Sequence, residues 1–223
     1  MPKTLVVFPG WSLGESSYKK LVSNLSGWNI VFVPYVKIAS RKSLHDISDE
    51  VSALLKRHPK AFVLGHSLGG ILAMDFAARY PEKVSRLFLV NSVGNISDLP
   101  LHRLFCGFAK NNLAYAKLAF WEQMRSFGRV VSNLRTQIKL ARHAARYDSS
   151  EVAGKVKVPT TLLWGTEDHL VSMEAGERLH KLISDSSLCV LKGEGHDWIV
   201  HKPEYLIGAC ELSKISCILH TNS

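Results

Sequence analysis

The chain has 223 residues, 46% of them hydrophobic, which suits one globular domain with a full-sized core and does not require a second. No apolar stretch approaches the ~18 residues of a membrane span, so the sequence argues against a membrane protein. The formal net charge is +9 and the sequence pI about 9.4, which suggests an acidic partner but says nothing about the fold.

The predicted elements alternate regularly along the chain. Six short apolar runs with little polar alternation are typical of strands buried in a parallel sheet, and they cover Thr4–Phe8, Ile30–Pro34, Ala61–Leu64, Arg86–Val90, Thr160–Trp164 and Leu188–Leu191. Helical patterns lie between them, over Ser17–Leu25, Leu44–Arg57, Gly69–Arg79 and Met173–Ile183, with a last one after Pro203. This order predicts an α/β fold with a mostly parallel, doubly wound sheet.

One long stretch interrupts this alternation. From about Ser92 to Lys157 the sequence predicts helices and turns but no strand. An insertion of this size between two strands is expected to lie over the strand ends as a lid. We therefore assign residues 1–94 and 158–223 to the α/β core and residues 95–157 to a helical lid inserted in the same domain.

The N-terminus and the cysteines bear on where the protein works. The first apolar run, Leu5–Phe8, is too short for a signal-peptide core. The four cysteines have no CxxC or CxxH spacing, which argues against a zinc site or a disulfide framework and fits a reducing compartment. We expect a cytoplasmic monomer without a metal or a cofactor.

A serine stands where a doubly wound sheet presents its ligands. Ser67 lies in Gly-His-Ser-Leu-Gly-Gly, between the third predicted strand and the following helix. Gly-x-Ser-x-Gly in this context is the pattern of a nucleophile elbow, although a glycine-rich turn with an incidental serine gives the same letters.

A serine nucleophile needs a base and an orienting acid, which should follow it in the order acid, then histidine. Asp168 lies in the loop after the fifth strand and His196 in the loop after the sixth. Both occupy the predicted strand ends, whereas the nearby Glu167, His169 and His201 are less well placed. The order and placement predict that Ser67, Asp168 and His196 form a catalytic triad.

The oxyanion hole should combine two backbone N–H groups. One belongs to Leu68, the residue after the serine, and the other to Trp11, in the loop after the first strand. A simple Pro-Gly turn is the alternative explanation of that loop.

Three stretches together give the chain a resemblance to the α/β-hydrolase superfamily, from Thr4 to about Tyr205. They are GHSLGG (65–70), VKVPTTLLWGTEDHLVS (156–172) and LKGEGHDWIVHKPE (191–204). Within the superfamily the chain resembles the carboxylesterases that demethylate pimeloyl-acyl-carrier-protein methyl ester in biotin synthesis. Their His-Gly-Trp-Gly loop corresponds here to residues 9–12, and their Ser-Leu-Gly-Gly to residues 67–70.

The chain departs from that family at three places. Pro9 replaces the histidine that normally braces the oxyanion loop, and residues 33–40 lack the usual Asp-x-Pro-Gly-x-Gly-x-Ser loop. The first strand corresponds to the third of the full fold. The resemblance therefore implies a sheet of about six strands that lacks the first two.

The predicted lid carries most of the positive charge. Residues 97–157 hold eleven Lys and Arg against four Asp and Glu. Four of the basic residues share one helix face, beside an apolar face with Leu134 and Ile138: they are Arg135, Lys139, Arg142 and Arg146. This face is either solvated or docks an acidic partner, and acyl-carrier proteins, which are acidic and carry a phosphate, would suit it.

A second set in the lid is apolar at helical spacing and consists of Leu113, Phe120, Trp121, Met124 and Phe127. Such a set packs a core or lid, or lines an acyl-sized slot above Ser67.

These patterns predict a serine carboxylesterase acting through an acyl-enzyme on a small ester substrate, with a pimeloyl chain on an acyl-carrier protein as the expected one. A thioesterase or small-ester hydrolase with the same triad is the first alternative. A ligand- or partner-binding protein on a hydrolase scaffold is the second. Nucleic acid is the other acidic partner to weigh, and we discount it because no recognition motif accompanies the charge and a nucleic-acid-binding role would not explain the triad.

Overall fold

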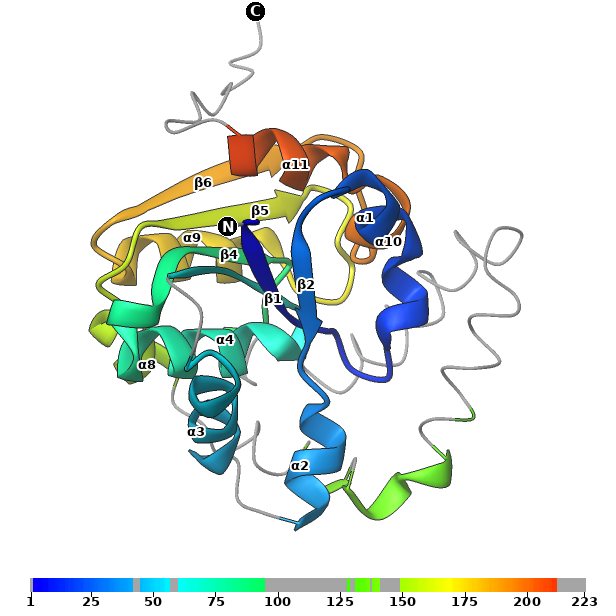
Figure 1. The fold of residues 1–223 in the computed structure, drawn as a ribbon. Helices are drawn as coiled ribbons and strands as arrows, with labels where there is room; N and C mark the ends of the chain where they lie inside the picture. The colour runs from blue at the N-terminus through cyan, green and yellow to red at the C-terminus, as the bar shows by residue number, and fades with distance from the viewer. Residues whose placement is uncertain are drawn as a thin grey trace, which may run out of the picture.

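The computed structural model describes residues 2–41, 45–56, 60–94, 128, 131–136, 138–140 and 149–211. Six strands in these residues form one parallel sheet in the order β2-β1-β3-β4-β5-β6 (Figure 1). The strands are β1 (Thr4–Phe8), β2 (Asn29–Phe32), β3 (Ala61–His66), β4 (Val84–Val90), β5 (Thr160–Gly165) and β6 (Ser186–Leu191). The predicted α/β architecture is confirmed, with strand ends displaced by one or two residues.

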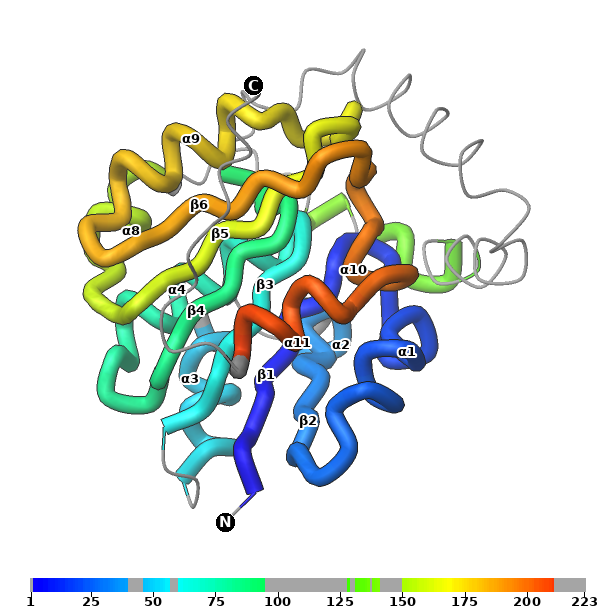
Figure 2. The backbone as a smooth tube through the Cα atoms, turned by 90° about the horizontal axis from the view of Figure 1, so that it is seen from above, coloured from blue at the N-terminus to red at the C-terminus, as the bar shows by residue number. Residues whose placement is uncertain are grey.

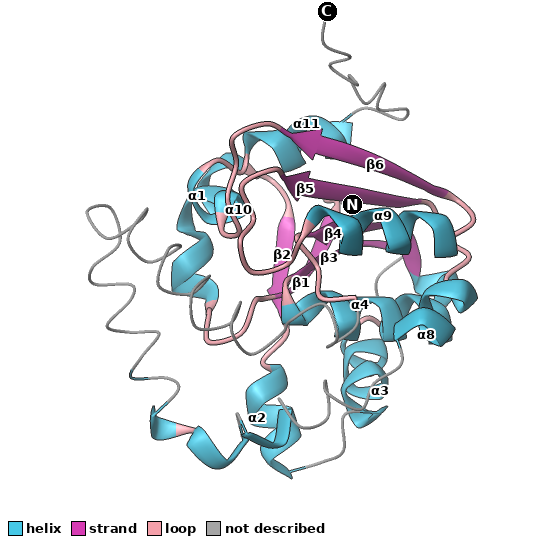
Figure 3. Cartoon of the chain, turned by 180° about the vertical axis from the view of Figure 1, so that it is seen from behind, coloured by secondary structure: helices cyan, strands magenta, loops and turns pink. Residues whose placement is uncertain are grey.

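Helices cover both faces of the sheet (Figures 2 and 3). One face carries α1 (Lys19–Asn24), α10 (Trp198–His201) and α11 (Glu204–Glu211), and the other carries α3 (His45–Leu54), α4 (Leu68–Arg79), α8 (Ser149–Lys155) and α9 (Met173–Leu182). Two short 3-10 turns, η1 (Glu15–Tyr18) and η2 (Pro81–Lys83), join these elements. No helix in the described part of the chain has the length and apolar character needed to span a membrane.

The sequence analysis missed α2 (Tyr35–Arg41), in the stretch without the expected glycine-rich loop. Tyr35 and Ala39 of this helix are buried in the core on the α4 side of the sheet. Tertiary burial of these side chains therefore stabilises a helix that its short length alone would not predict.

The two faces of the sheet bury separate apolar clusters because successive strand residues point to opposite sides. In β1, Val6 and Phe8 pack with α3 and α4, whereas Leu5 and Val7 pack with α1 and α11. Every residue of β1 is buried. This two-sided burial explains why the strands show near-continuous apolar runs rather than alternation.

The strand order reverses beside β1. The chain passes from β1 to β2 on one side and then crosses to β3 on the other, where Phe8 pairs with Gly65. Ligand sites in such sheets lie at the carboxyl ends of the strands at this switch point. The loops after β1 and β3 therefore meet where a site is expected.

The predicted lid lies mostly outside the described residues. Within residues 95–157 the structure describes only Gly128, 131–136, 138–140 and 149–157, which include α8. The division into core and lid thus stays a prediction.

The cysteines correct one expectation. Cys189 on β6 is disulfide-bonded, and Cys210 in α11 is buried. Spacing along the chain does not report which cysteines the fold brings within bonding distance, so the sequence missed this bond.

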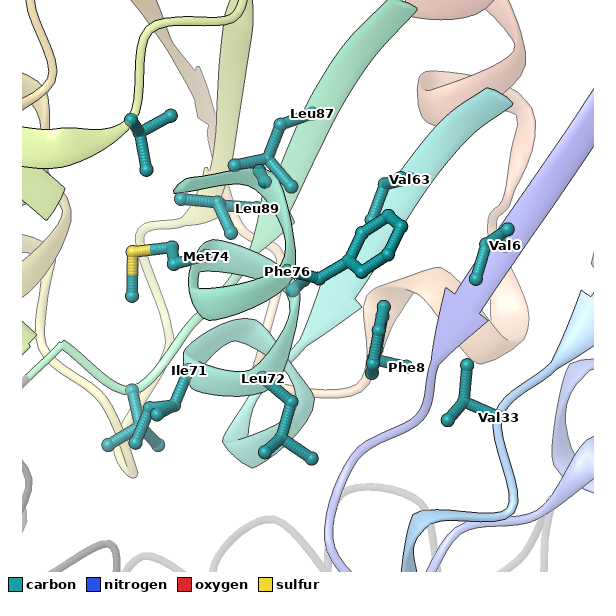
Figure 4. Close-up of a cluster of buried hydrophobic side chains, with 14 of the residues drawn as sticks. Val6, Phe8, Val33, Val63, Ile71, Leu72, Met74, Phe76, Leu87 and Leu89 are labelled. Carbon is teal, nitrogen blue, oxygen red and sulfur yellow. The ribbon is translucent and has the colours of Figure 1, made fainter. Parts of the chain in front are cut away.

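Phe76 of α4 offers a test of the core (Figure 4). Its side chain is fully buried, with its ring 6.2 Å from that of Phe8. We expect Phe76→Ala to lower the free energy of unfolding by about 3–5 kcal/mol, because the substitution leaves a cavity in the core. Leu54→Ala, at a side chain that is 56% exposed, should change it by no more than about 0.5 kcal/mol. Equal effects in urea denaturation would contradict this placement of α4.

Candidate active site

Ser67 stands on a strained turn between β3 and α4. Its φ of 52° and ψ of −122° lie in a region that residues with a side chain rarely adopt. Hydrogen bonds hold this conformation: the Ser67 N–H donates to the Val90 carbonyl at 3.0 Å, and the Ser67 carbonyl accepts the N–H groups of Gly70 and Val93, both at 3.0 Å. The turn raises the serine hydroxyl above the carboxyl edge of the sheet, as in a nucleophile elbow.

The flanking glycines make this turn possible by close packing. A Cβ atom at Gly65 would lie 2.6 Å from the Gly70 Cα atom. One at Gly69 would lie 2.1 Å from the Phe8 carbonyl oxygen and 2.5 Å from that of Pro9. Glycine at these positions lets the start of α4 approach the end of β1, which brings the loop after β1 against the elbow.

The structure brings together the three side chains of the predicted triad. His196 Nε2 lies 2.9 Å from Ser67 Oγ, and His196 Nδ1 lies 2.8 Å from Asp168 Oδ2. Both His196 and Asp168 are buried. This is the geometry in which a histidine can take a proton from the serine while a carboxylate orients its ring.

The less favoured residues lie outside this arrangement. Glu167 and His169 are exposed and face each other, with His169 Nε2 3.8 Å from Glu167 Oε2. His201 ends α10.

The Asp168 carboxylate is fixed on both oxygens. Its Oδ1 accepts the N–H groups of Leu170 and Val171, each at 2.8 Å. Its Oδ2 accepts hydrogen bonds from His196 and from the Asn91 amide, the latter at 2.6 Å. Such a carboxylate orients the imidazole with little freedom of its own.

Asn91 is a residue that the sequence analysis missed. It follows β4, is fully buried, and has a positive φ of 42°. Its Nδ2 also donates to the Gly195 carbonyl at 3.2 Å, and its Oδ1 accepts from Trp198 Nε1 at 3.1 Å and from the Gly165 N–H at 3.2 Å. Asn91 therefore joins the loops after β4, β5 and β6. Its signal in the sequence was a polar residue directly after a buried strand.

Burial and two neighbouring carboxylates set the pKa of His196. Burial by itself lowers the pKa of His196, but the charge of Asp168, the hydrogen bond to it and the charge of Asp197 together outweigh burial. The net result is a pKa above the ordinary histidine value. Asp168 thus stabilises the imidazolium that forms when His196 takes up a proton.

A second histidine lies behind the triad. His66 is fully buried, and its ring centroid is 5.4 Å from that of His196. Ligand-type atoms of His66, His196 and Asp197 lie within 4.8 Å of one another, the spacing of a metal site. However, all four ring nitrogens of the two histidines already make hydrogen bonds, so a metal would have to displace these bonds.

The predicted oxyanion donors lie on the two adjoining loops. Leu68 is the first residue of α4, directly after Ser67. Trp11 lies in the loop after β1, with 40% of its surface exposed. Their loops are neighbours, and the role of the two amides stays a prediction.

Seven predicted lid residues lie outside the described residues, namely Leu113, Phe120, Trp121, Met124, Phe127, Arg142 and Arg146. Arg135 and Lys139 are described, and the Lys139 ammonium donates to the Ala39 carbonyl of α2 at 2.9 Å. The neighbouring Leu134 and Ile138 are 53% and 42% exposed. In this segment, then, a basic side chain contacts the body of the protein while apolar ones face outward.

Comparison with known proteins places the chain in a family. The model of the family described as "Serine aminopeptidase, S33" matches residues 39–203. Among similar proteins, the uncharacterized hydrolase YugF of Bacillus subtilis is 28% identical in a region that covers 66% of this chain and 62% of YugF. A pimeloyl-[acyl-carrier protein] methyl ester esterase of Neisseria meningitidis is 25% identical over 87% of this chain and 86% of its own length. The monoacylglycerol lipase ABHD6 of Mus musculus is 26% identical over 74% of this chain and 60% of its own.

Solved structures show the same fold. MGS-M2, an α/β-hydrolase from a Medee basin deep-sea metagenome, superposes with a TM-score of 0.72, at 18% identity, over 96% of this chain and 91% of its own. A putative lipase of Acinetobacter baumannii gives 0.71, at 17% identity, over 93% of this chain and 81% of its own. The predicted α/β-hydrolase fold is thereby confirmed.

The pKa of His196 tests the pairing with Asp168 without reference to catalysis. In Asp168→Asn the negative charge is gone but the burial remains, so the pKa of His196 should fall below the ordinary value of 6.5. NMR titration of protein labelled with ¹⁵N-histidine, with the resonance assigned by His196→Gln, measures it.

Glu167→Gln is the matched control, because Glu167 is the adjacent but exposed acid. It should leave the pKa of His196 unchanged. A larger fall with Glu167→Gln than with Asp168→Asn would show that the wrong carboxylate is assigned to the pair.

Proposed function

Because this chain belongs to the serine aminopeptidase, S33 family and is an ester-hydrolysing enzyme of the α/β-hydrolase fold, we propose that it is a serine carboxylesterase working through a covalent acyl-enzyme. The observation that carries the proposal is the position of His196, within hydrogen-bond distance of both Ser67 and Asp168. This continuous chain of hydrogen bonds supports a nucleophile, a base and an orienting acid.

In the first half-reaction, Ser67 Oγ attacks the ester carbonyl carbon while His196 Nε2 takes the hydroxyl proton. The tetrahedral intermediate then collapses, the bond to the alkoxy group breaks, and His196 returns the proton to the departing alcohol. In the second half-reaction, water attacks the acyl-enzyme with His196 again as base. The free acid leaves and the serine is restored.

The negative charge on the carbonyl oxygen must be stabilised while the intermediate exists. The Leu68 N–H at the start of α4 and the Trp11 N–H after β1 are the proposed donors, and the position of Leu68 at the N-terminus of a twelve-residue helix favours an anion there. Losing one such donor costs on the order of 100-fold or more in rate.

For the substrate, we propose the methyl ester of a pimeloyl chain on an acyl-carrier protein. The named activity of the Neisseria meningitidis relatives and the excess of basic residues in 97–157 support this choice. In this proposal residues 95–157 form the lid, with Arg135, Arg142 and Arg146 facing the acidic carrier. Phe120, Trp121, Met124 and Phe127 line the acyl slot.

A small neutral ester is the competing substrate class. It is favoured by the monoacylglycerol lipase named among the relatives and by the exposed apolar side chains of Leu134 and Ile138. The triad would act on either substrate, so the two candidates differ only in how the ester is presented.

Parallel assays of methyl pimeloyl-acyl-carrier protein and p-nitrophenyl acetate test both levels of the proposal. Ser67→Ala should abolish hydrolysis of both esters, because the nucleophile is gone. The double variant Arg142→Glu/Arg146→Glu should raise KM for the carrier-bound ester by at least about tenfold through charge repulsion, and leave p-nitrophenyl acetate unaffected.

Lys181→Glu, at an exposed basic residue of α9, is the matched control and should change neither substrate. If the wild type cleaves p-nitrophenyl acetate but not the carrier-bound ester, the result supports the carboxylesterase activity and contradicts the proposed carrier-bound substrate. If it cleaves neither ester, the binding-protein hypothesis replaces the proposed carboxylesterase.

A further inference from the structure

We propose that Tyr18 and His66 are positioning residues, and that together they form a buried hydrogen-bond relay between the oxyanion loop and the backbone of His196. The inference rests on the proposed function, because it assigns the loop after β1 to oxyanion binding. It adds two residues to which the sequence analysis gave no role in the reaction.

Three hydrogen bonds make up the relay. The Gly10 N–H donates to Tyr18 Oη at 3.0 Å, and Tyr18 Oη lies 2.8 Å from His66 Nδ1. On the other side of the ring, His66 Nε2 lies 3.2 Å from the His196 carbonyl oxygen. The relay therefore begins one residue before Trp11 and ends on the catalytic base.

The two ends of the relay fix every proton in it. A backbone N–H can only donate and a carbonyl can only accept. His66 Nε2 therefore carries a proton and donates a hydrogen bond to the His196 carbonyl oxygen. Because the buried ring is neutral near pH 7, His66 Nδ1 is then an acceptor, and the Tyr18 hydroxyl donates to it. Tyr18 Oη in turn accepts the Gly10 N–H. Each donor and each acceptor is used, and no alternative tautomer satisfies both ends.

The burial of the two side chains agrees with this assignment. Tyr18 and His66 are both fully buried. Burial lowers the pKa of His66 to about 4 and raises that of Tyr18, so both groups are neutral near pH 7. The Asp197 carboxylate, 3.7 Å from His66 Nε2, favours the proton on that nitrogen.

Gly10 is held on its carbonyl side as well. Its carbonyl oxygen accepts the Tyr35 hydroxyl at 3.2 Å and the Leu13 N–H at 3.1 Å. A Cβ atom at Gly10 would lie 3.0 Å from His66 Nδ1, so the loop lies directly against the His66 ring. Since Pro9 has neither an N–H nor a polar side chain, these tyrosines supply the brace of the loop.

The relay acts on the transition state rather than on substrate binding. It fixes the loop that carries the Trp11 amide relative to the elbow and to His196, and the oxyanion forms only after attack. A displacement of about 1 Å in such a group can cost on the order of 100-fold in rate. Loss of the relay should therefore lower kcat and leave KM nearly unchanged.

Tyr18→Phe removes the hydroxyl and keeps the ring. We expect kcat for p-nitrophenyl butyrate, normalised to active sites titrated with a phosphonate, to fall about 10- to 100-fold with KM within about threefold. Affinity for a boronic acid, which mimics the tetrahedral intermediate, should fall in parallel with kcat. Tyr80→Phe is the matched control: it removes a hydroxyl that bonds Asp49 on the exposed surface, and it should change neither value.

His66→Asn and the double variant separate a relay from two independent packing effects. In a relay, the second substitution adds little to the first, so the kcat of the double variant should lie near that of the worse single one. Multiplied losses would overturn the proposal. So would a Tyr18→Phe enzyme with wild-type kcat, provided that Ser67→Ala is inactive in the same assay. Activity in Ser67→Ala would instead overturn the proposed function beneath it.

Discussion

The backbone at Ser67 is the constraint on which the site depends. A positive φ of 52° in a residue with a side chain is strained, and it persists only because the surroundings over-determine it. Three features hold the Ser67 backbone in this conformation: the pairing of β3 with a strand on each side, the hydrogen bond to Val90, and the close packing of Gly65 and Gly69. The core thus keeps a serine hydroxyl at the one edge of the sheet where the other loops arrive.

Buried polar groups then fix those loops relative to one another. Asn91 joins the loops that carry Asp168 and His196, and His66 with Tyr18 joins the His196 backbone to the loop after β1. Buried hydrogen bonds are costly to leave unsatisfied, so each loop has a narrow choice of positions. In this account the sheet supplies the common edge, and these side chains set the final distances between the proposed catalytic groups.

The sequence predicted the sheet, and it named the three side chains that the structure brings together at its edge, since both follow local rules. Buried strands leave apolar runs, and Ser67, Asp168 and His196 stand directly after three of them. Asn91 and Tyr18 obey no local motif: their roles arise from contacts with residues 77 and 48 positions away. The contact of Lys139 with α2 was missed for the same reason, because a helical wheel gives the face of a side chain but not what that face meets.

Covalent labelling tests the central claim most directly. After incubation with a fluorophosphonate, peptide mass spectrometry should find one adduct, on Ser67, and His196→Ala should slow its formation strongly. The absence of an adduct would contradict the account, because it would mean that Ser67 is strained but not activated. An adduct on another buried serine at this edge, such as Ser92, would contradict it too, because it would mean that a different serine is the nucleophile.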